Sequence, residues 1–293
     1  MGLVFALEFF NNTVRTIDDV RQQDLIVLGI IPSIGYSETE KKRFKFFSAE
    51  KNNGGLKRRL MTKENPKSPV SESYRSLRTN LLYSSPKKEP KTILVSSAGP
   101  GEGKTTTVAN LAITYANLGK KTLLIDTDLR RPVVHNVFEM NREDGITNYL
   151  AHATDNYKSL IKKTSIKNLN VITAGVIPPN PSELLGSDRM TSFIKKIEKE
   201  WDIILFDSPP LVAVTDATMI SKEIDMIVMV VKVGHTDKKA FEHTINNLRN
   251  VNAPLGGIIL NAVTHKNSYG SYYYNYYYQY YNYYGSDSNN ENS

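Results

Sequence analysis

The chain of 293 residues contains no cysteine. Without thiols it can form neither a disulfide bridge nor a thiolate-ligated metal site, and this composition is compatible with a reducing cytoplasm. Its five histidines show none of the spacings typical of zinc ligands. Ser96, Ser97 and Ser208 have no histidine partner in a recognisable triad arrangement. No pattern therefore supports a zinc enzyme or a serine hydrolase.

Long apolar runs are also missing. No run approaches the roughly 18 residues of a membrane-spanning helix. Residues 3–10 (LVFALEFF) are apolar, but they are few and contain Glu8. They lack the charged start and the small-residue cleavage site of a signal peptide. This segment is interpreted either as the end of a membrane span whose beginning is absent or as the start of a helix.

Positive charge exceeds negative charge, and the formal net charge is +7 at pH 7. Such a balance favours an anionic partner: a nucleotide, a nucleic acid or an acidic membrane surface. Residues 38–59 concentrate lysine and arginine around Phe44, Phe46 and Phe47. This stretch is either a solvated linker or a segment attracted to anionic lipid headgroups.

The most informative stretch is residues 92–106 (TILVSSAGPGEGKTT), although Ala98 replaces the first glycine of the formal pattern. An apolar run leads into a glycine-rich turn, a Lys-Thr pair and a helical pattern, which is the layout of a P-loop. Its backbone N–H groups would cradle phosphate, Lys104 would reach the β- and γ-phosphates, and Thr105 would bind Mg²⁺. The alternative is a glycine-rich turn that binds nothing. The expected nucleotide-binding residues of the loop are Gly99, Gly101, Glu102, Gly103, Lys104, Thr105 and Thr106.

Three aspartates end strands of the buried type. Asp207 follows four apolar residues, 203–206, an arrangement typical of a Walker B motif whose carboxylate reaches Mg²⁺. Asp126 and Asp128 end the strand at 121–128 two residues apart, so they point to the same face. The pair can share one Mg²⁺ site, or one carboxylate can accept the proton of an attacking hydroxyl. The structural alternative for Asp207 is a helix cap, and that for Asp126 and Asp128 is a polar strand end.

Almost wholly apolar strands alternate with helical patterns. This alternation predicts an α/β fold of the P-loop NTPase type, a doubly wound and mainly parallel sheet with helices on both faces. Ligands of such sheets bind outside the carboxyl ends of the strands, where all the candidate polar groups fall. The expected strands are residues 24–32, 93–95, 121–128, 169–174, 202–207, 225–233 and 256–263, with helices at 71–82, from the P-loop onward, from 185 to about 199, and at 237–250.

Two further features lie near this edge of the predicted sheet. Asn261 ends the last strand and could hydrogen-bond an adenine edge. Arg130 and Arg131 either steady phosphate charge or are ordinary surface arginines.

The helix at 71–82 is expected to begin with Ser71 as its N-cap.

On that helix Glu72, Arg75 and Arg78 recur every three residues along one face. The stripe is either a solvated set of ion pairs or a surface that pairs between subunits.

The chain is expected to divide into an appendage at residues 1–60, a main domain at 61–268 and a tail at 269–293. The tail is of low complexity, with tyrosines separated only by Gly, Ser, Asn and Gln. Because no period of 2.0 or 3.6 marks a buried face, disorder or adaptable structure is expected. Its eleven tyrosines are Tyr269, Tyr272, Tyr273, Tyr274, Tyr276, Tyr277, Tyr278, Tyr280, Tyr281, Tyr283 and Tyr284.

Taken together, these motifs resemble the bacterial tyrosine kinases of capsule and exopolysaccharide export. The family's features occur in order from residue 65 to 284, the most specific being the second Walker motif around Asp126 and Asp128 combined with the tyrosine cluster. Residues 9–32 look like the cytoplasmic end of the polysaccharide chain-length regulator, just after its second membrane span. The segments that carry the family resemblance are SESYRSLRTN, SSAGPGEGKTT, LLIDTDLRRP, PPNPSELL and ILFDSPP.

The resemblance implies an ATP- and Mg²⁺-dependent protein-tyrosine kinase with defined roles for these residues. Lys104 and Thr105 would be the Walker A pair, Asp126 the catalytic base, and Asp128 and Asp207 the Mg²⁺ ligands. Residues 1–60 would be a juxtamembrane activator fused to the kinase domain. Self-association into a ring would follow from Glu72, Arg75 and Arg78, and the tail of one subunit would be phosphorylated in its neighbour's site.

The same resemblance implies partners and a location. The partners would be a transmembrane chain-length regulator, a cognate tyrosine phosphatase and polysaccharide-synthesis enzymes as substrates, with no nucleic acid. The chain would be cytoplasmic and peripheral to the inner membrane, and its parent could span that membrane.

Two alternatives stay open on the residues alone. A partitioning or division-site ATPase shares the broader fold, but that group usually has an extra lysine where this chain has Gly99, and it lacks a tyrosine tail. A non-enzymatic scaffold would leave the P-loop and the aspartates unexplained.

Overall fold

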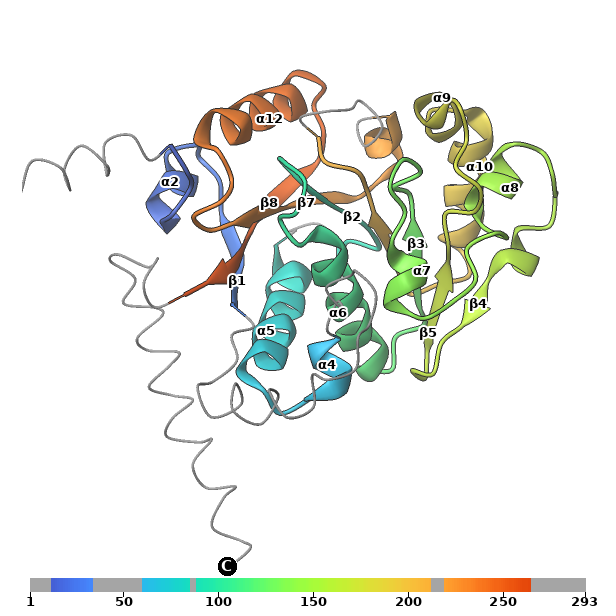
Figure 1. Cartoon of the computed structure of the whole chain (residues 1–293), viewed down its shortest axis with the longest axis horizontal. Coiled ribbons are helices and arrows are strands. Elements are labelled where there is room, and N and C mark those ends of the chain that lie inside the picture. Colours follow the sequence, from blue (N-terminus) through green and yellow to red (C-terminus); the bar gives the residue numbers. More distant parts are fainter. Residues whose placement is uncertain (1–11, 34–59, 85–87, 212–218, 265–293) are drawn as a thin grey trace, which may run out of the picture.

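The computed structural model describes residues 12–33, 60–84, 88–211 and 219–264. These residues form one eight-stranded sheet in the order β1-β8-β7-β2-β6-β3-β5-β4 (Figure 1). Every neighbouring pair of strands is parallel except β5 and β4. The predicted α/β class is confirmed. The strands are β1 (Val27–Pro32), β2 (Thr92–Ser97), β3 (Thr122–Asp126), β4 (Lys162–Lys163), β5 (Leu169–Ile172), β6 (Ile203–Asp207), β7 (Met226–Lys232) and β8 (Leu255–Val263).

Helices cover both faces of this sheet (Figure 1). Because successive strand residues point to opposite faces, Leu94 belongs to one core while Ile93 and Val95 belong to the other. The second core contains buried side chains of α4 (Met61–Glu64), α5 (Pro69–Tyr83), α6 (Lys104–Asn117) and α7 (Val134–Val137). The first contains those of α2 (Ile17–Arg21), α8 (Ile146–Leu150), α9 (Pro181–Leu185), α10 (Asp188–Ile197) and α12 (Lys238–Asn250).

Helix α5 begins earlier than the sequence predicts. Its N-cap is Ser68, whose Oγ accepts a hydrogen bond from the Ser71 N–H at 3.2 Å, and Pro69 occupies the first helical position. Proline suits that position because its missing N–H would have no helical partner there. The prediction of Ser71 as the N-cap is wrong. Its hydroxyl instead donates to the carbonyl of Asn65 at 2.7 Å.

The helix expected up to about residue 199 is two helices. A break at Gly186 separates α9 from α10, and Ser187 is extended, with its side chain accepting from the Met190 N–H. A serine N-cap satisfies a donor that the new helix leaves without a partner. Two short 3₁₀ helices, Tyr157–Leu160 and Ser221–Glu223, complete the described elements.

Residues 12–33 pack on the sheet, whereas the sequence predicts an appendage. Strand β1 pairs in parallel with β8 at the edge of the sheet, and Leu28 and Ile31 on β1 are buried. The strand begins later than the predicted residue 24, because Asp24 has a φ of 53° in the turn after α2. An apolar strand needs a partner for its backbone donors and acceptors, and β8 supplies it.

Several sequence predictions fall outside the described residues. They are the apolar residues 3–10, the basic stretch with Phe44, Phe46 and Phe47, and the tyrosine cluster at 269–284. Within the described ranges, no helix has the length and apolar character needed to cross a membrane.

Candidate nucleotide and phosphoryl-transfer site

The P-loop has the predicted order of strand, loop and helix. Strand β2 is buried along its whole length, and α6 begins at Lys104 directly after Gly103. Gly101 and Gly103 have φ values of 74° and 95°, in the left-handed region that favours glycine. A Cβ on Gly103 would also lie 2.2 Å from Nδ2 of Asn261. The glycines therefore let the backbone turn tightly at the start of α6, where its N–H groups can face an anion.

Parallel pairing gathers the acidic residues beside this loop. Asp126 of β3 lies opposite Asp207 of β6, and Asp207 lies opposite Val95 of β2. Oγ1 of Thr105 donates to Oδ2 of Asp207 at 2.7 Å. A hydroxyl and a carboxylate so placed are the ligand types that Mg²⁺ takes beside the phosphates of a bound nucleotide, so these residues fit the ion.

Lys104 lies between two carboxylates. Its Nζ is 2.9 Å from Oδ2 of Asp128 and 3.5 Å from Oδ1 of Asp207, and its side chain is 12% exposed. Burial alone would lower the pKa of Lys104, but the charges of Asp207 and Asp128 outweigh burial and raise that pKa. Lys104 therefore remains a cation, positioned between the loop and the strand ends.

Burial has the largest effect on the protonation of the Asp207 carboxyl. It raises the pKa of this carboxyl, although Lys104 and the Thr105 hydroxyl oppose the change. A carboxylate in such surroundings gains from any further cation placed beside it. Among the residues described, no three or more acidic or histidine side chains are grouped as a metal site. Mg²⁺ usually takes one or two protein carboxylates together with phosphate oxygens and water.

Asp126, the predicted catalytic base, is fully buried, and its carboxylate accepts hydrogen bonds from backbone N–H groups. Its Oδ2 accepts from the N–H groups of Val133 and Val134 at 3.1 and 3.0 Å, and its Oδ1 accepts from that of Asp128 at 3.2 Å. Burial, and next the charge of Asp207, raise the pKa of Asp126. The carboxyl closes the loop after β3, a contact that the sequence did not predict.

Both carboxylate oxygens of Asp128 already have partners within the chain. Its Oδ2 pairs with Lys104, and its Oδ1 accepts from the Arg131 N–H at 3.0 Å. The predicted roles of Asp126 and Asp128 as base and metal ligand stay predictions. The structure shows that both lie at the carboxyl end of β3, next to Lys104.

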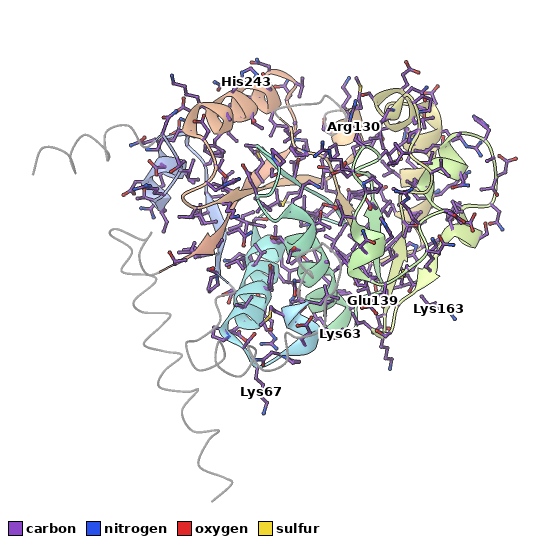
Figure 2. All side chains as sticks on the ribbon, in the orientation of Figure 1. Lys63, Lys67, Arg130, Glu139, Lys163 and His243 are labelled. Atoms are coloured by element: carbon purple, nitrogen blue, oxygen red, sulfur yellow. The ribbon has the colours of Figure 1, made fainter. Side chains whose placement is uncertain are left out.

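The remaining predicted residues support the loop or its rim. Nδ2 of Asn261 donates to the carbonyl of Glu102 at 2.8 Å, while its predicted adenine contact stays a prediction. Thr106 is half-buried in the first turn of α6. Arg131 is exposed, and Arg130 points toward α9 (Figure 2), where it donates to Oγ of Ser182 at 3.2 Å.

The predicted stripe on α5 divides into two parts. Arg75 pairs with Glu72 at 2.5 Å on the exposed face, and its Nη2 also donates to the carbonyl of Pro66. Arg78 instead reaches α6, where its Nη1 donates to the carbonyl of Thr114 at 2.7 Å. Arg78 thus has an intramolecular partner in the last turns of the P-loop helix, and the self-association role of all three residues stays a prediction.

The sequence reasoning missed the contacts of residues 12–19 with the loop between β7 and α12. Val14 is fully buried, its N–H donates to the carbonyl of Thr236 at 2.8 Å, and its own carbonyl accepts from the Gly234 N–H at 2.9 Å. Thr16 and Asp19 form a capping box at the start of α2. That box was a usable signal, because a threonine followed three residues later by an acidic side chain marks a helix start.

Comparison with known proteins gives independent evidence on the family to which this chain belongs. The AAA domain family model matches residues 90–256. The tyrosine-protein kinase YwqD of Bacillus subtilis is 38% identical over 225 residues, covering 76% of this chain and 94% of YwqD. The solved kinase domain of the Escherichia coli tyrosine kinase ETK is 30% identical with a TM-score of 0.74, covering 87% of this chain and 97% of that one.

Two further matches bear on chain organisation. The crystal structure of the chimerical protein CapA2B2 is 32% identical with a TM-score of 0.71, covering 83% of this chain and 96% of that one. Against the whole tyrosine-protein kinase Etk of Escherichia coli, the match covers 92% of this chain but 37% of that protein. The chain thus corresponds to nearly all of YwqD and to about a third of Etk.

Proposed function

The chain belongs to the family of bacterial tyrosine-protein kinases, and we propose that it transfers the γ-phosphoryl group of ATP to tyrosines of its own C-terminal cluster, residues 269–284. The observation that carries this proposal is the grouping of Lys104 and Thr105 of the P-loop with Asp128 and Asp207 at the neighbouring strand ends. Phosphoryl transfer depends mainly on positioning and charge, which these four side chains supply.

Each side chain takes a role that its contacts allow. Lys104 would exchange its carboxylate partners for the β- and γ-phosphate oxygens. Thr105 and Asp207 would hold Mg²⁺, with Asp128 beside them. When bound, Mg²⁺ would neutralise charge that develops on the phosphates.

Asp126 is proposed as the proton acceptor. The tyrosine oxygen would form a bond to the γ-phosphorus, the bond from that phosphorus to the β–γ bridging oxygen would break, and ADP would leave. The phenolic proton would pass to the Asp126 carboxylate. A raised pKa suits a general base that works near neutral pH.

Self-association and context belong to the same proposal. The exposed Glu72–Arg75 pair leaves this face of α5 accessible to a second subunit, whose tail would enter the site. Each added phosphate carries about −1.5 to −2 charges, so phosphorylation would drive the assembly apart. The chain would regulate capsular or extracellular polysaccharide synthesis at the inner membrane, with a chain-length regulator, a phosphatase and polysaccharide-synthesis enzymes as partners.

A mixing experiment tests this function. A chain with Lys104→Met is mixed with an active chain in which all eleven tail tyrosines are phenylalanine, and γ-labelled ATP is added with Mg²⁺. Label is expected on the tail of the Lys104→Met chain only in the mixture. No label on any tyrosine, despite ATP turnover, would contradict the proposal and favour a partitioning-type ATPase.

A further inference from the structure

Two exposed apolar side chains, Val176 and Ile177, have no role in the chemistry proposed above. They are 58% and 47% exposed and follow Gly175 in the connection from β5 to α9. Ligands of parallel sheets bind at the carboxyl ends of the strands, which is where this connection begins. Among the described residues seven large apolar side chains are exposed, and four of the others lie at the end of a helix or between it and the strand that follows: Ile26, Tyr83, Leu118 and Val251. Those four therefore belong to the amino ends of strands.

The backbone that leads to Val176 is held by the start of α8. The N–H and the Oγ1 of Thr147 both donate to the carbonyl of Ala174, at 2.9 and 2.7 Å. Gly175 has a φ of 88°, and a Cβ on it would lie 2.8 Å from Oδ1 of Asn148. Because the chain is fixed up to Gly175, the fold itself places the two apolar side chains at the surface.

This connection lies beside the proposed proton acceptor. Ile172, the last residue of β5, lies opposite Ile125 of β3, so the residues after it leave the sheet next to Asp126. The loop after β3 also contacts α9, because Nη2 of Arg130 donates to Oγ of Ser182 at 3.2 Å. Helix α9 lies on the same side of the molecule as β3 and β5, away from β1 and β8 (Figure 1). The exposed pair is therefore on the side of the site where an acceptor hydroxyl has to enter.

The chemistry of the proposed acceptor matches an apolar surface. Residues 269–284 contain eleven tyrosines and no Asp, Glu, Lys or Arg. A segment without charge cannot be recognised through ion pairs, so its recognition depends on the packing of rings and on hydrogen bonds. Exposed apolar patches on a folded domain mark surfaces of this kind. Met219, the seventh exposed apolar side chain, lies against Gly186 at the other end of α9 and extends the patch.

We propose that Val176 and Ile177 form a docking surface for the tyrosine cluster 269–284 of a second copy of this chain. Rings next to the acceptor tyrosine would pack on these two side chains while the acceptor hydroxyl reaches Asp126. The pair would select the peptide that is bound and take no part in the transfer itself. The inference rests on the proposed function, because it assigns the surface that recognises the acceptor. Its expected effect is on the KM for the acceptor and not on kcat or nucleotide affinity.

The experiment measures phosphorylation of a synthetic peptide of residues 269–293 by the full-length chain. The enzyme carries serine at all eleven tail tyrosines, so that its own tail is not an acceptor. Val176→Ser and Ile177→Ser are each expected to raise the KM for the peptide about tenfold with kcat unchanged, the effect of losing one apolar side chain that is largely buried on binding. Ile177→Leu should keep the KM of the parent enzyme, because it retains the apolar surface.

The matched control is Val251→Ser, because Val251 is 45% exposed but lies after α12, before the amino end of β8. Its KM should equal that of the parent, and all variants should bind Mg²⁺-ADP alike. An unchanged KM in both Val176→Ser and Ile177→Ser, or an equal rise in Val251→Ser, would overturn the docking surface and leave the proposed function in place.

Two further outcomes have distinct meanings. Serine variants that change sedimentation of the chain but not the KM would overturn the inference, since the surface would then be a contact between folded subunits. If the parent enzyme transfers no phosphate to the peptide, the proposed function fails and this inference fails with it.

Discussion

Lys104 is held by buried carboxylates before any nucleotide is considered. Its partners Asp128 and Asp207 are themselves buried, so the lysine offsets negative charge that has no access to solvent. Removing one partner from a buried ion pair is costly because the other charge stays desolvated. The same cation that would bind phosphate therefore also stabilises the folded site.

Lys104→Met should consequently destabilise the nucleotide-free protein by about 3 kcal/mol at pH 8. The loss should be smaller at pH 5 than at pH 8, because burial raises the pKa of the Asp207 carboxyl and a lower pH favours its neutral form. Urea unfolding at both pH values measures this difference. Lys120→Met is the control, since Lys120 pairs with Glu89 at the surface. Equal losses at the two pH values would contradict the account.

Glu102 gives a second prediction at the residue scale. Its pKa is about 7 in the folded chain against 4.5 ordinarily, so between these values the folded state binds more protons than the unfolded state. Its contribution to stability is therefore present below pH 4.5 and is lost as the pH rises toward 7. Glu102→Gln should flatten the dependence of unfolding free energy on pH in this window, whereas the exposed Glu143→Gln should not. Identical slopes for the two variants would count against the buried carboxyl.

At the scale of elements, α5 and α6 are joined by Arg78. Its guanidinium bonds the carbonyl of Thr114 near the C-terminal end of α6, where the helix dipole favours a cation. Within the described residues, its buried Nε has no hydrogen-bond partner. Arg78 thus ties the helix that carries the P-loop to its neighbour.

Two arginine variants separate structure from assembly. Arg78→Ala should lower the free energy of unfolding by about 1–2 kcal/mol, because it removes a charged donor from a helix end. Arg75→Ala should destabilise the fold less than Arg78→Ala does, because its pair with Glu72 and its bond to the Pro66 carbonyl are exposed, yet weaken self-association. Urea unfolding and sedimentation velocity measure the two effects. Equal destabilisation by both variants would show that the arginines act alike.

The elements that the sequence predicted well are those whose signal is local. For strands such as 203–207 and for the glycine turn before Lys104, the local sequence alone indicates the conformation. The N-cap of α5 differs from the prediction because Ser68 and Ser71 both lie near the helix start. Only Pro69, which suits the first helical position, indicates that Ser68 is the cap. The sequence predicts a strand at 24–32 but not its place in the main sheet, because its partner β8 lies more than 200 residues away in the chain.

Within the site, the sequence predicted residues but not their bonds. The carboxyl ends of β2, β3 and β6 bring Lys104, Asp126 and Asp207 together as expected. The hydrogen bonds of Asp126 to Val133 and Val134 depend on how a loop returns, and no spacing rule gives that. The hydrogen bond from Asn261 to the Glu102 carbonyl likewise joins segments that only the finished fold places side by side.

At the scale of the whole molecule, one sheet unites the two ends of the described chain. Residues 12–33 and β8 lie together at one edge, and β7 continues from β8 to the P-loop strand (Figure 1). The segment that resembles a regulator's tail and the strand before the tyrosine cluster are therefore neighbours in space.

The most direct test of the central claim is mass spectrometry of the purified chain after incubation with Mg²⁺-ATP, with Lys104→Met treated identically. The account predicts phosphate on tyrosines between 269 and 284 in the wild type and none in the variant. ATP turnover without phosphotyrosine, or equal phosphorylation of both proteins, would contradict it.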